Sequence, residues 1–242
     1  MLMGETKFDE DKKMILSHQS LQQLKQQNIH MKNKITTLFL DIGGVLLSDG
    51  WGHNFRHKAA AMFNLDAAEM EARHKLVFVV YEEGRMTLDE YLEEVVFYEK
   101  RRFSANQFRD FMFAQTTPNP AMIDFIKKLK KKYGLQVAAV SNEARELNDY
   151  RIQTFRLKEL IDFFISSCYV HIRKPDAEIF RLALDIARVQ PEQVIYIDDV
   201  EMFTEVASEL GIKSIHHVNE VSTANQIKAM GLPIEENEIS YA

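Results

Sequence analysis

One short stretch decides the fold class of this chain: residues 36–47, which read TTLFLDIGGVLL. Its apolar and β-branched residues run into Asp41 without alternation, as in a parallel strand that is buried on both faces. Open α/β sheets bind their ligands at the carboxyl ends of such strands. Gly43 and Gly44 then allow a tight turn and a close backbone approach to a ligand. Asp41 is therefore the first candidate for a functional residue.

The composition sets broad limits on what the chain does. Its 242 residues, 46% hydrophobic and 27% charged, are typical of a globular protein with one large domain or a domain carrying an insert. The net charge of −6 argues against nucleic acid as a partner. The single cysteine, Cys168, excludes an intrachain disulfide and fits a reducing compartment. No apolar stretch approaches the ~20 residues of a membrane span, and the N-terminus does not resemble a secretory signal. We expect a cytoplasmic monomer or homodimer.

The rest of the chain divides into three kinds of segment. Residues 1–33 are rich in Gln and Lys and are expected to form an appended extension, helical or mobile. Residues 50–116 read as helical, with helix starts at Asp66, at Thr87 (a capping box with Glu90) and at Ser104.

Strands and helices alternate after residue 117. The pattern predicts strands over 136–140, 163–166, 194–197 and 213–216, and helices over 143–155, 175–188, 201–210 and 219–230. Such alternation indicates an α/β fold with a doubly wound parallel sheet. We therefore predict a core domain, residues 34–49 and 117–242, interrupted by a helical cap domain, residues 50–116.

Polar residues also stand at the ends of the later strands. Ser141 and Asn142 end the second strand, Lys174 precedes the helix after the third, and Asp198 and Asp199 end the fourth. Each signal is weak by itself, because an N-cap or a turn explains it better than a functional role does. In one parallel sheet, however, these strand ends meet Asp41 at a single rim.

The residue types at this rim favour phosphate chemistry. Three carboxylates crowded together need a cation, because like charges raise each other's pKa. Their hard oxygen atoms suit Mg²⁺, which bridges to phosphates. Lys174 adds positive charge, Ser141 can donate to a phosphoryl oxygen, and the backbone N–H groups of Ile42, Gly43 and Gly44 can cradle the same group. Asp41 is then a nucleophile that forms an aspartyl-phosphate, which water hydrolyses.

With these motifs, the sequence resembles the haloacid dehalogenase (HAD) superfamily of hydrolases. The resemblance spans residues 36–219 and, within the superfamily, is to the C1-capped subfamily I and its sugar-phosphate phosphatases. It rests on four core motifs and on a cap segment: Asp41-Ile42-Gly43-Gly44-Val45, Ser141-Asn142, Arg173-Lys174-Pro175-Asp176, Ile195-Tyr196-Ile197-Asp198-Asp199, and residues 82–91 in the cap.

The resemblance implies a role for each residue of the rim. Asp41 would be the nucleophile and a Mg²⁺ ligand, together with the Gly43 carbonyl and Asp199, while Asp198 would act beside Asp199 or through water. Ser141 and Lys174 would bind the phosphoryl group, and Asn142 would contact the substrate.

Two positions depart from the family pattern. Most phosphatases of the family carry a general acid and base, an aspartate, where this chain has Gly43. The absence of this aspartate removes general acid–base assistance, which typically raises the reaction rate by ~10²–10⁴-fold. A further acid or amide that usually supports the metal is replaced by Phe203, with Glu201 and Glu205 as the nearest substitutes.

The substrate is less well defined than the chemistry. Trp51 and Arg56 are candidates to contact it from the cap, and His53 and His57 lie four residues apart, so that they share a helix face. A zinc pair at these histidines has no evident third ligand in the sequence.

We expect a Mg²⁺-dependent phosphatase that acts on a small phosphorylated metabolite, with a sugar phosphate as the first candidate. One alternative is a catalytically weak binding or regulatory protein that keeps the fold. Another is a metal-free 2-haloacid dehalogenase, which the paired acids Asp198 and Asp199 disfavour.

Overall fold

The computed structural model describes residues 34–235, so the predicted extension over residues 1–33 lies outside the described residues. The strands and α-helices that it describes are β1 (Thr37–Leu40), α2 (His53–Phe63), α3 (Ala67–Glu82), α4 (Leu88–Val95), α5 (Ala105–Ala114), α6 (Pro120–Tyr133), β2 (Gln136–Ser141), α7 (Arg145–Thr154), β3 (Phe163–Ser166), α8 (Ser167–Val170), α9 (Glu178–Ala187), β4 (Val194–Asp198), α10 (Glu201–Glu209), β5 (Lys213–His216) and α11 (Glu220–Ala229). Two short 3-10 helices, η1 (Leu157–Glu159) and η2 (Pro191–Gln193), lie between them. None of the helices in residues 34–235 is both long enough and apolar enough to cross a membrane.

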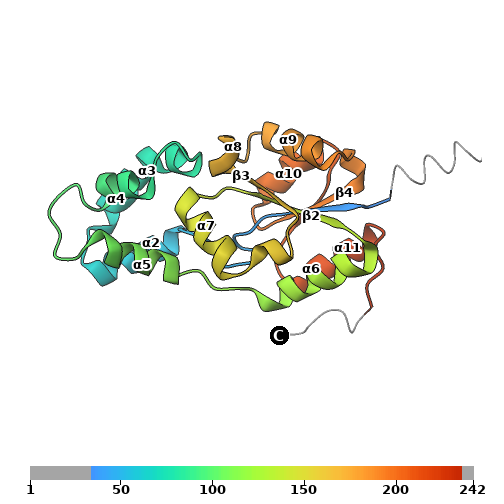
Figure 1. The fold of residues 1–242 in the computed structure, drawn as a ribbon, viewed down its shortest axis with the longest axis horizontal. Helices are drawn as coiled ribbons and strands as arrows, with labels where there is room; N and C mark the ends of the chain where they lie inside the picture. The colour runs from blue at the N-terminus through green and yellow to red at the C-terminus, as the bar shows by residue number, and fades with distance from the viewer. Residues whose placement is uncertain (1–33, 236–242) are drawn as a thin grey trace, which may run out of the picture. The chain divides into compact units, whose positions relative to one another are not determined.

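The five strands form one parallel sheet in the order β3-β2-β1-β4-β5. This confirms the predicted α/β class. Helices α6 and α11 lie on one side of the sheet, and α9 and α10 lie on the other (Figure 1). The chain reverses its direction of winding at β1, so Asp41 follows the central strand, where a doubly wound sheet binds ligands.

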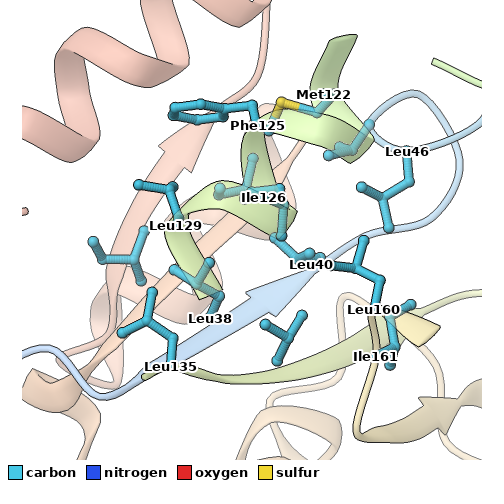
Figure 2. Close-up of a cluster of buried hydrophobic side chains, with 14 of the residues drawn as sticks. Leu38, Leu40, Leu46, Met122, Phe125, Ile126, Leu129, Leu135, Leu160 and Ile161 are labelled. Atoms are coloured by element: carbon cyan, nitrogen blue, oxygen red, sulfur yellow. The ribbon is translucent and has the colours of Figure 1, made fainter. Parts of the chain in front are cut away.

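Strand β1 is buried on both faces, as its unbroken apolar run predicts. Leu38 and Leu40 pack into the cluster beneath α6, with Phe125 and Ile126 (Figure 2). Phe39 points to the opposite cluster, which α9 and α10 cover. The sheet is therefore fixed in register by core packing on both sides, and that register fixes the position of Asp41.

Helices α2 to α5 form the insert between β1 and α6, at the end of the sheet where β1 ends (Figure 1). They have an apolar cluster of their own, which includes Tyr91, Phe108 and Met112. The predicted helix starts are confirmed: Thr87 and Ser104 each begin a helix with a capping box. We refer to residues 50–116 as the insert, and the division of the chain into separate domains stays a prediction.

Two core helices begin later than the sequence predicts. The helix expected from residue 143 begins at Arg145, because the Glu143 N–H donates to Ser167 Oγ and its carboxylate pairs with Arg151. The helix expected from residue 175 begins at Glu178, whose N–H is held by the Asp176 carboxylate. In both places a side-chain contact holds the backbone of the expected first turn outside the helix.

Candidate active site

The turn after β1 places Asp41 at the rim of the sheet. The Asp41 N–H continues the pairing with β4 by donating to Ile197 O at 2.9 Å. Gly44 has a φ of +69°, and a Cβ atom added there would lie 2.0 Å from Asp199 Oδ2. A glycine is therefore needed at position 44 both for the turn and for the close approach of Asp199.

Lys174 joins the rim of β1 to the rim of β4. Its Nζ donates to Asp41 Oδ1 at 2.9 Å, to Asp198 Oδ2 at 2.6 Å and to Tyr196 Oη at 3.1 Å. The lysine side chain is only 1% exposed. The structure thus brings together three of the predicted site residues, Asp41, Lys174 and Asp198, through one buried ammonium group.

Asn142 holds the backbone of this lysine in place. Its amide oxygen accepts from Lys174 N at 2.8 Å, and its amide nitrogen donates to Lys174 O at 3.0 Å. Both polar atoms of the Asn142 side chain are therefore engaged by Lys174, and the predicted substrate contact of Asn142 stays a prediction.

The burial of these charges perturbs their protonation. Burial raises the pKa of Asp41 to about 7; the nearby Lys174 ammonium opposes this shift and the Asp198 carboxylate adds to it. Burial alone would lower the pKa of Lys174, but Asp41 and Asp198 outweigh it and raise the pKa. The pKa of Asp199 is raised by burial and then by Asp198 and Asp49. The raised pKa values of Asp41 and Asp199 show that Lys174 alone does not offset the burial and mutual repulsion of these carboxylates.

The acidic residues fit a hard divalent cation. Oxygen atoms of Asp41, Asp198 and Asp199 lie within 4.8 Å of one another. Asp198 already accepts bonds from Lys174, Tyr196 and the Val200 N–H. Asp41 and the exposed Asp199 are therefore better placed than Asp198 to bind a cation directly, and their carboxylates suit Mg²⁺. The predicted contribution of the Gly43 carbonyl stays a prediction.

Ser141 belongs to a buried network that the sequence did not reveal. Its hydroxyl donates to Glu143 Oε1 at 3.2 Å, and the same oxygen accepts from Arg151 Nη1 at 2.6 Å. The side chains of Glu143 and Arg151 are each 2% exposed. Arg151 Nη2 also donates to Ser48 O, and it lies 3.8 Å from the place where a Cβ atom of residue 43 would stand. A buried cation therefore faces the position where an acid was expected.

The insert contributes a second wall to the site. A cavity of about 390 Å³ is lined by Asp41, Lys174 and Asp199 from the sheet and by Trp51 and Arg56 from the insert. Trp51 Nε1 donates to Tyr91 Oη at 3.0 Å, which fixes the indole. Arg56 pairs with Glu71, a residue that the sequence did not single out. Both predicted insert residues thus line the cavity while being held by neighbours.

Glu82, at the end of α3, lines this cavity together with Arg173. The Glu82 carboxylate accepts from Arg173 Nη2 at 2.7 Å, and the Glu82 carbonyl accepts from Ser167 Oγ at 2.7 Å.

Phe203 also lines the cavity, and its ring centre lies 4.9 Å from Lys174 Nζ. Glu201 and Glu205 are exposed and do not line it. The structure therefore gives no support to these two residues as replacements for the missing metal-supporting group.

The family model for haloacid dehalogenase-like hydrolases matches residues 35–211 of this chain. Pig bifunctional epoxide hydrolase 2 is 28% identical over 117 residues, which cover 47% of this chain and only 21% of that protein. A phosphorylated carbohydrates phosphatase of Thermotoga maritima is 31% identical over 108 residues, 45% of this chain and 47% of that protein.

A solved structure with the same fold is the HAD family enzyme of Bacteroides thetaiotaomicron in complex with magnesium and inorganic phosphate. It superposes with a TM-score of 0.65 at 23% identity, over 75% of this chain and 93% of that chain.

Proposed function

Since the chain belongs to the haloacid dehalogenase-like hydrolase family, we propose that it is a Mg²⁺-dependent phosphatase. Its substrate would be a small phosphorylated metabolite, with sugar phosphates as the first candidates. The observation that carries the proposal is one cavity lined by the buried Asp41 and Lys174 and by the exposed Asp199, with the buried Asp198 paired to Lys174. A nucleophile, a fixed cation and ligands for a second cation are what phosphoryl transfer requires.

In the first step an Asp41 carboxylate oxygen attacks phosphorus, and the bond from phosphorus to the leaving oxygen breaks. Lys174 holds Asp41 through Oδ1 at 2.9 Å and stays protonated, so that it orients the nucleophile and offsets negative charge. In the proposed step the Ser141 hydroxyl turns its hydrogen from Glu143 Oε1, to which it donates in the structure, to a phosphoryl oxygen. The leaving oxygen takes its proton from water or from the substrate, because Gly43 has no group to supply one.

In the second step water attacks phosphorus in the aspartyl-phosphate. This releases inorganic phosphate and restores the Asp41 carboxylate. Asp41 and Asp199, with the Gly43 carbonyl, would hold Mg²⁺, whose charge shields the carboxylate from the phosphate when the ion is bound. Ionised Asp41 is the reactive form, and a bound cation favours this form over the protonated one that burial favours.

The insert is proposed to be a C1 cap that selects the substrate. Trp51 and Arg56 line the cavity opposite the sheet. The relatives support a phosphate ester as substrate, because one acts on phosphorylated carbohydrates and a structure with the same fold holds magnesium and phosphate.

The proposal is tested by hydrolysis of an aryl phosphate and a panel of phosphorylated sugars, with Mg²⁺ or with EDTA. We expect phosphate release that requires Mg²⁺ and falls to background in Asp41→Asn. The exposed Asp185→Asn, on α9, is the matched control and should retain activity. Equal phosphate release by Asp41→Asn and the wild type would refute the proposal, and metal-independent halide release from a 2-haloacid would favour a dehalogenase.

A further inference from the structure

A second cluster of metal-binding side chains lies in the insert. His53 and His57 are four residues apart on α2, and their ring centres are 4.2 Å apart. Glu71, on the neighbouring helix α3, supplies the third ligand that the sequence lacked: its Oε2 is 3.4 Å from His53 Nδ1. Donor atoms of the three residues lie within 4.8 Å of one another.

Arg56 fixes the carboxylate of this cluster. Its Nε donates to Glu71 Oε1 at 2.6 Å and its Nη2 to Oε2 at 3.0 Å. Glu71 is therefore held in one orientation by a contact that uses both of its carboxylate oxygens. The shorter bond to Arg56 uses Oε1, and Oε2 is the oxygen that approaches His53.

The spacing of one pair of donor atoms fits a small tetrahedral ion. With ligand bonds of ~2.0–2.1 Å, two ligands of a tetrahedral Zn²⁺ ion stand ~3.3–3.4 Å apart. The distance of 3.4 Å between His53 Nδ1 and Glu71 Oε2 matches this separation. His57 is exposed on the same helix face, so its ring can rotate toward the pair.

The ligand types set this cluster apart from the acidic rim. Imidazole suits zinc and similar transition metals, whereas carboxylates alone suit Mg²⁺. Two histidines with one glutamate also leave a fourth position open, as in catalytic zinc sites. His53 and Arg56 line the same cavity as Asp41, so an ion held here would add positive charge at its insert side.

We propose that His53, His57 and Glu71 form a binding site for a transition-metal ion, with Zn²⁺ as the best fit. Arg56 is a positioning residue of this site, since it orients Glu71. The site is distinct from the Mg²⁺ site at the rim of the sheet, and it does not depend on the phosphatase proposal. An ion bound here cross-links α2 to α3.

The site is tested by titrating the metal-free full chain with Co²⁺, in excess Mg²⁺ that occupies the acidic rim. We expect one equivalent of Co²⁺ to give the visible absorption of a tetrahedral N/O site, and Zn²⁺ to abolish it. The double variant His53→Ala/His57→Ala should lose this absorption, because both nitrogen ligands are gone. Its affinity for Co²⁺ should be lower than that of the wild type by at least about 100-fold. Both side chains are exposed, so the variant should fold.

Two control variants locate the ion. Asp41→Asn should keep the Co²⁺ signal, which separates the proposed site from the acidic rim. His171→Ala removes an exposed histidine outside the cluster and should also keep it. In a second measurement, Zn²⁺ should raise the midpoint of thermal unfolding of the wild type but not of the double variant. A signal that persists in the double variant, or a wild type without the signal, would overturn the proposal.

Discussion

Replacing Lys174 with methionine removes the ammonium group that joins Asp41 to Asp198. Nζ lies 2.9 Å from Asp41 Oδ1 and 2.6 Å from Asp198 Oδ2, and the side chain is 1% exposed. Methionine fills a similar volume, so the loss is electrostatic rather than a cavity. Breaking a buried ion pair by removing one partner typically costs about 3–5 kcal/mol. We expect the free energy of unfolding in EDTA at about pH 8 to fall by this amount.

The loss should depend on pH with a definite sign. Burial raises the pKa of Asp41 to about 7 even with the lysine present, and without the lysine it rises further. A carboxyl whose pKa is raised in the folded state contributes stability when protonated, and this contribution is lost as the pH rises through that pKa. The difference between variant and wild type should therefore be smaller at about pH 5 than at about pH 8.

Urea denaturation followed by circular dichroism measures this difference. Lys127→Met, at an exposed position on α6, is the matched control and should change stability by less than about 0.5 kcal/mol. A loss below about 1 kcal/mol for Lys174→Met at the higher pH would contradict the account of a buried ion pair, as would a loss that does not vary with pH.

Three further changes test other parts of the site. Gly43→Asp places a carboxylate near Arg151, and the added Cβ atom makes only ordinary contacts of 3.8 Å. Turnover of an alkyl phosphate should then rise about 10-fold, because its leaving group needs a proton. Turnover of nitrophenyl phosphate, whose leaving group needs no proton, should stay nearly constant. An unchanged ratio of the two rates would show that no acid is missing. Gly44→Ala forces Asp199 away from the turn and strains a φ of +69°. The Mg²⁺ concentration for half-maximal activity should therefore rise at least about 10-fold, and the free energy of unfolding should fall by about 1–2 kcal/mol. An unaltered Mg²⁺ dependence would show that Asp199 does not bind the metal. Burial, followed by the charge of Arg56, lowers the pKa of His74 to about 4. This histidine therefore contributes stability that is lost as the pH falls from about 6.5 toward 4, and the loss amounts to about 2 kcal/mol by pH 5. In urea denaturation, the free energy of unfolding of His74→Gln should fall less than that of the wild type between pH 7 and pH 5. An equal fall in the two proteins would contradict the lowered pKa of His74.

The parts of the fold that were predictable carry local signals. The apolar run into Asp41 and the strand-helix alternation depend only on burial and periodicity, and they gave β3 and β5 with their observed ends. Capping residues such as Thr87 marked helix starts because the cap bond is made within four residues.

The parts that were missed depend on contacts between distant segments. Arg151 is buried on a polar helix, and only the fold brings it beside Ser48 and Glu143. Glu71 lies on α3, and it becomes a neighbour of His53 only when α3 packs on α2. A glutamate immediately after Ser141-Asn142 was a usable signal, but nothing in its spacing revealed the arginine that pairs with it.

The most direct test of the central claim is to look for phosphate on Asp41 itself. The enzyme is mixed with an aryl phosphate and Mg²⁺, quenched rapidly in acid, digested and analysed by mass spectrometry. We predict that the peptide containing Asp41 carries one added phosphoryl group, and that Asp41→Asn carries none and releases no phosphate. Catalytic phosphate release without any phosphorylated Asp41 peptide, and with activity retained in Asp41→Asn, would contradict the account.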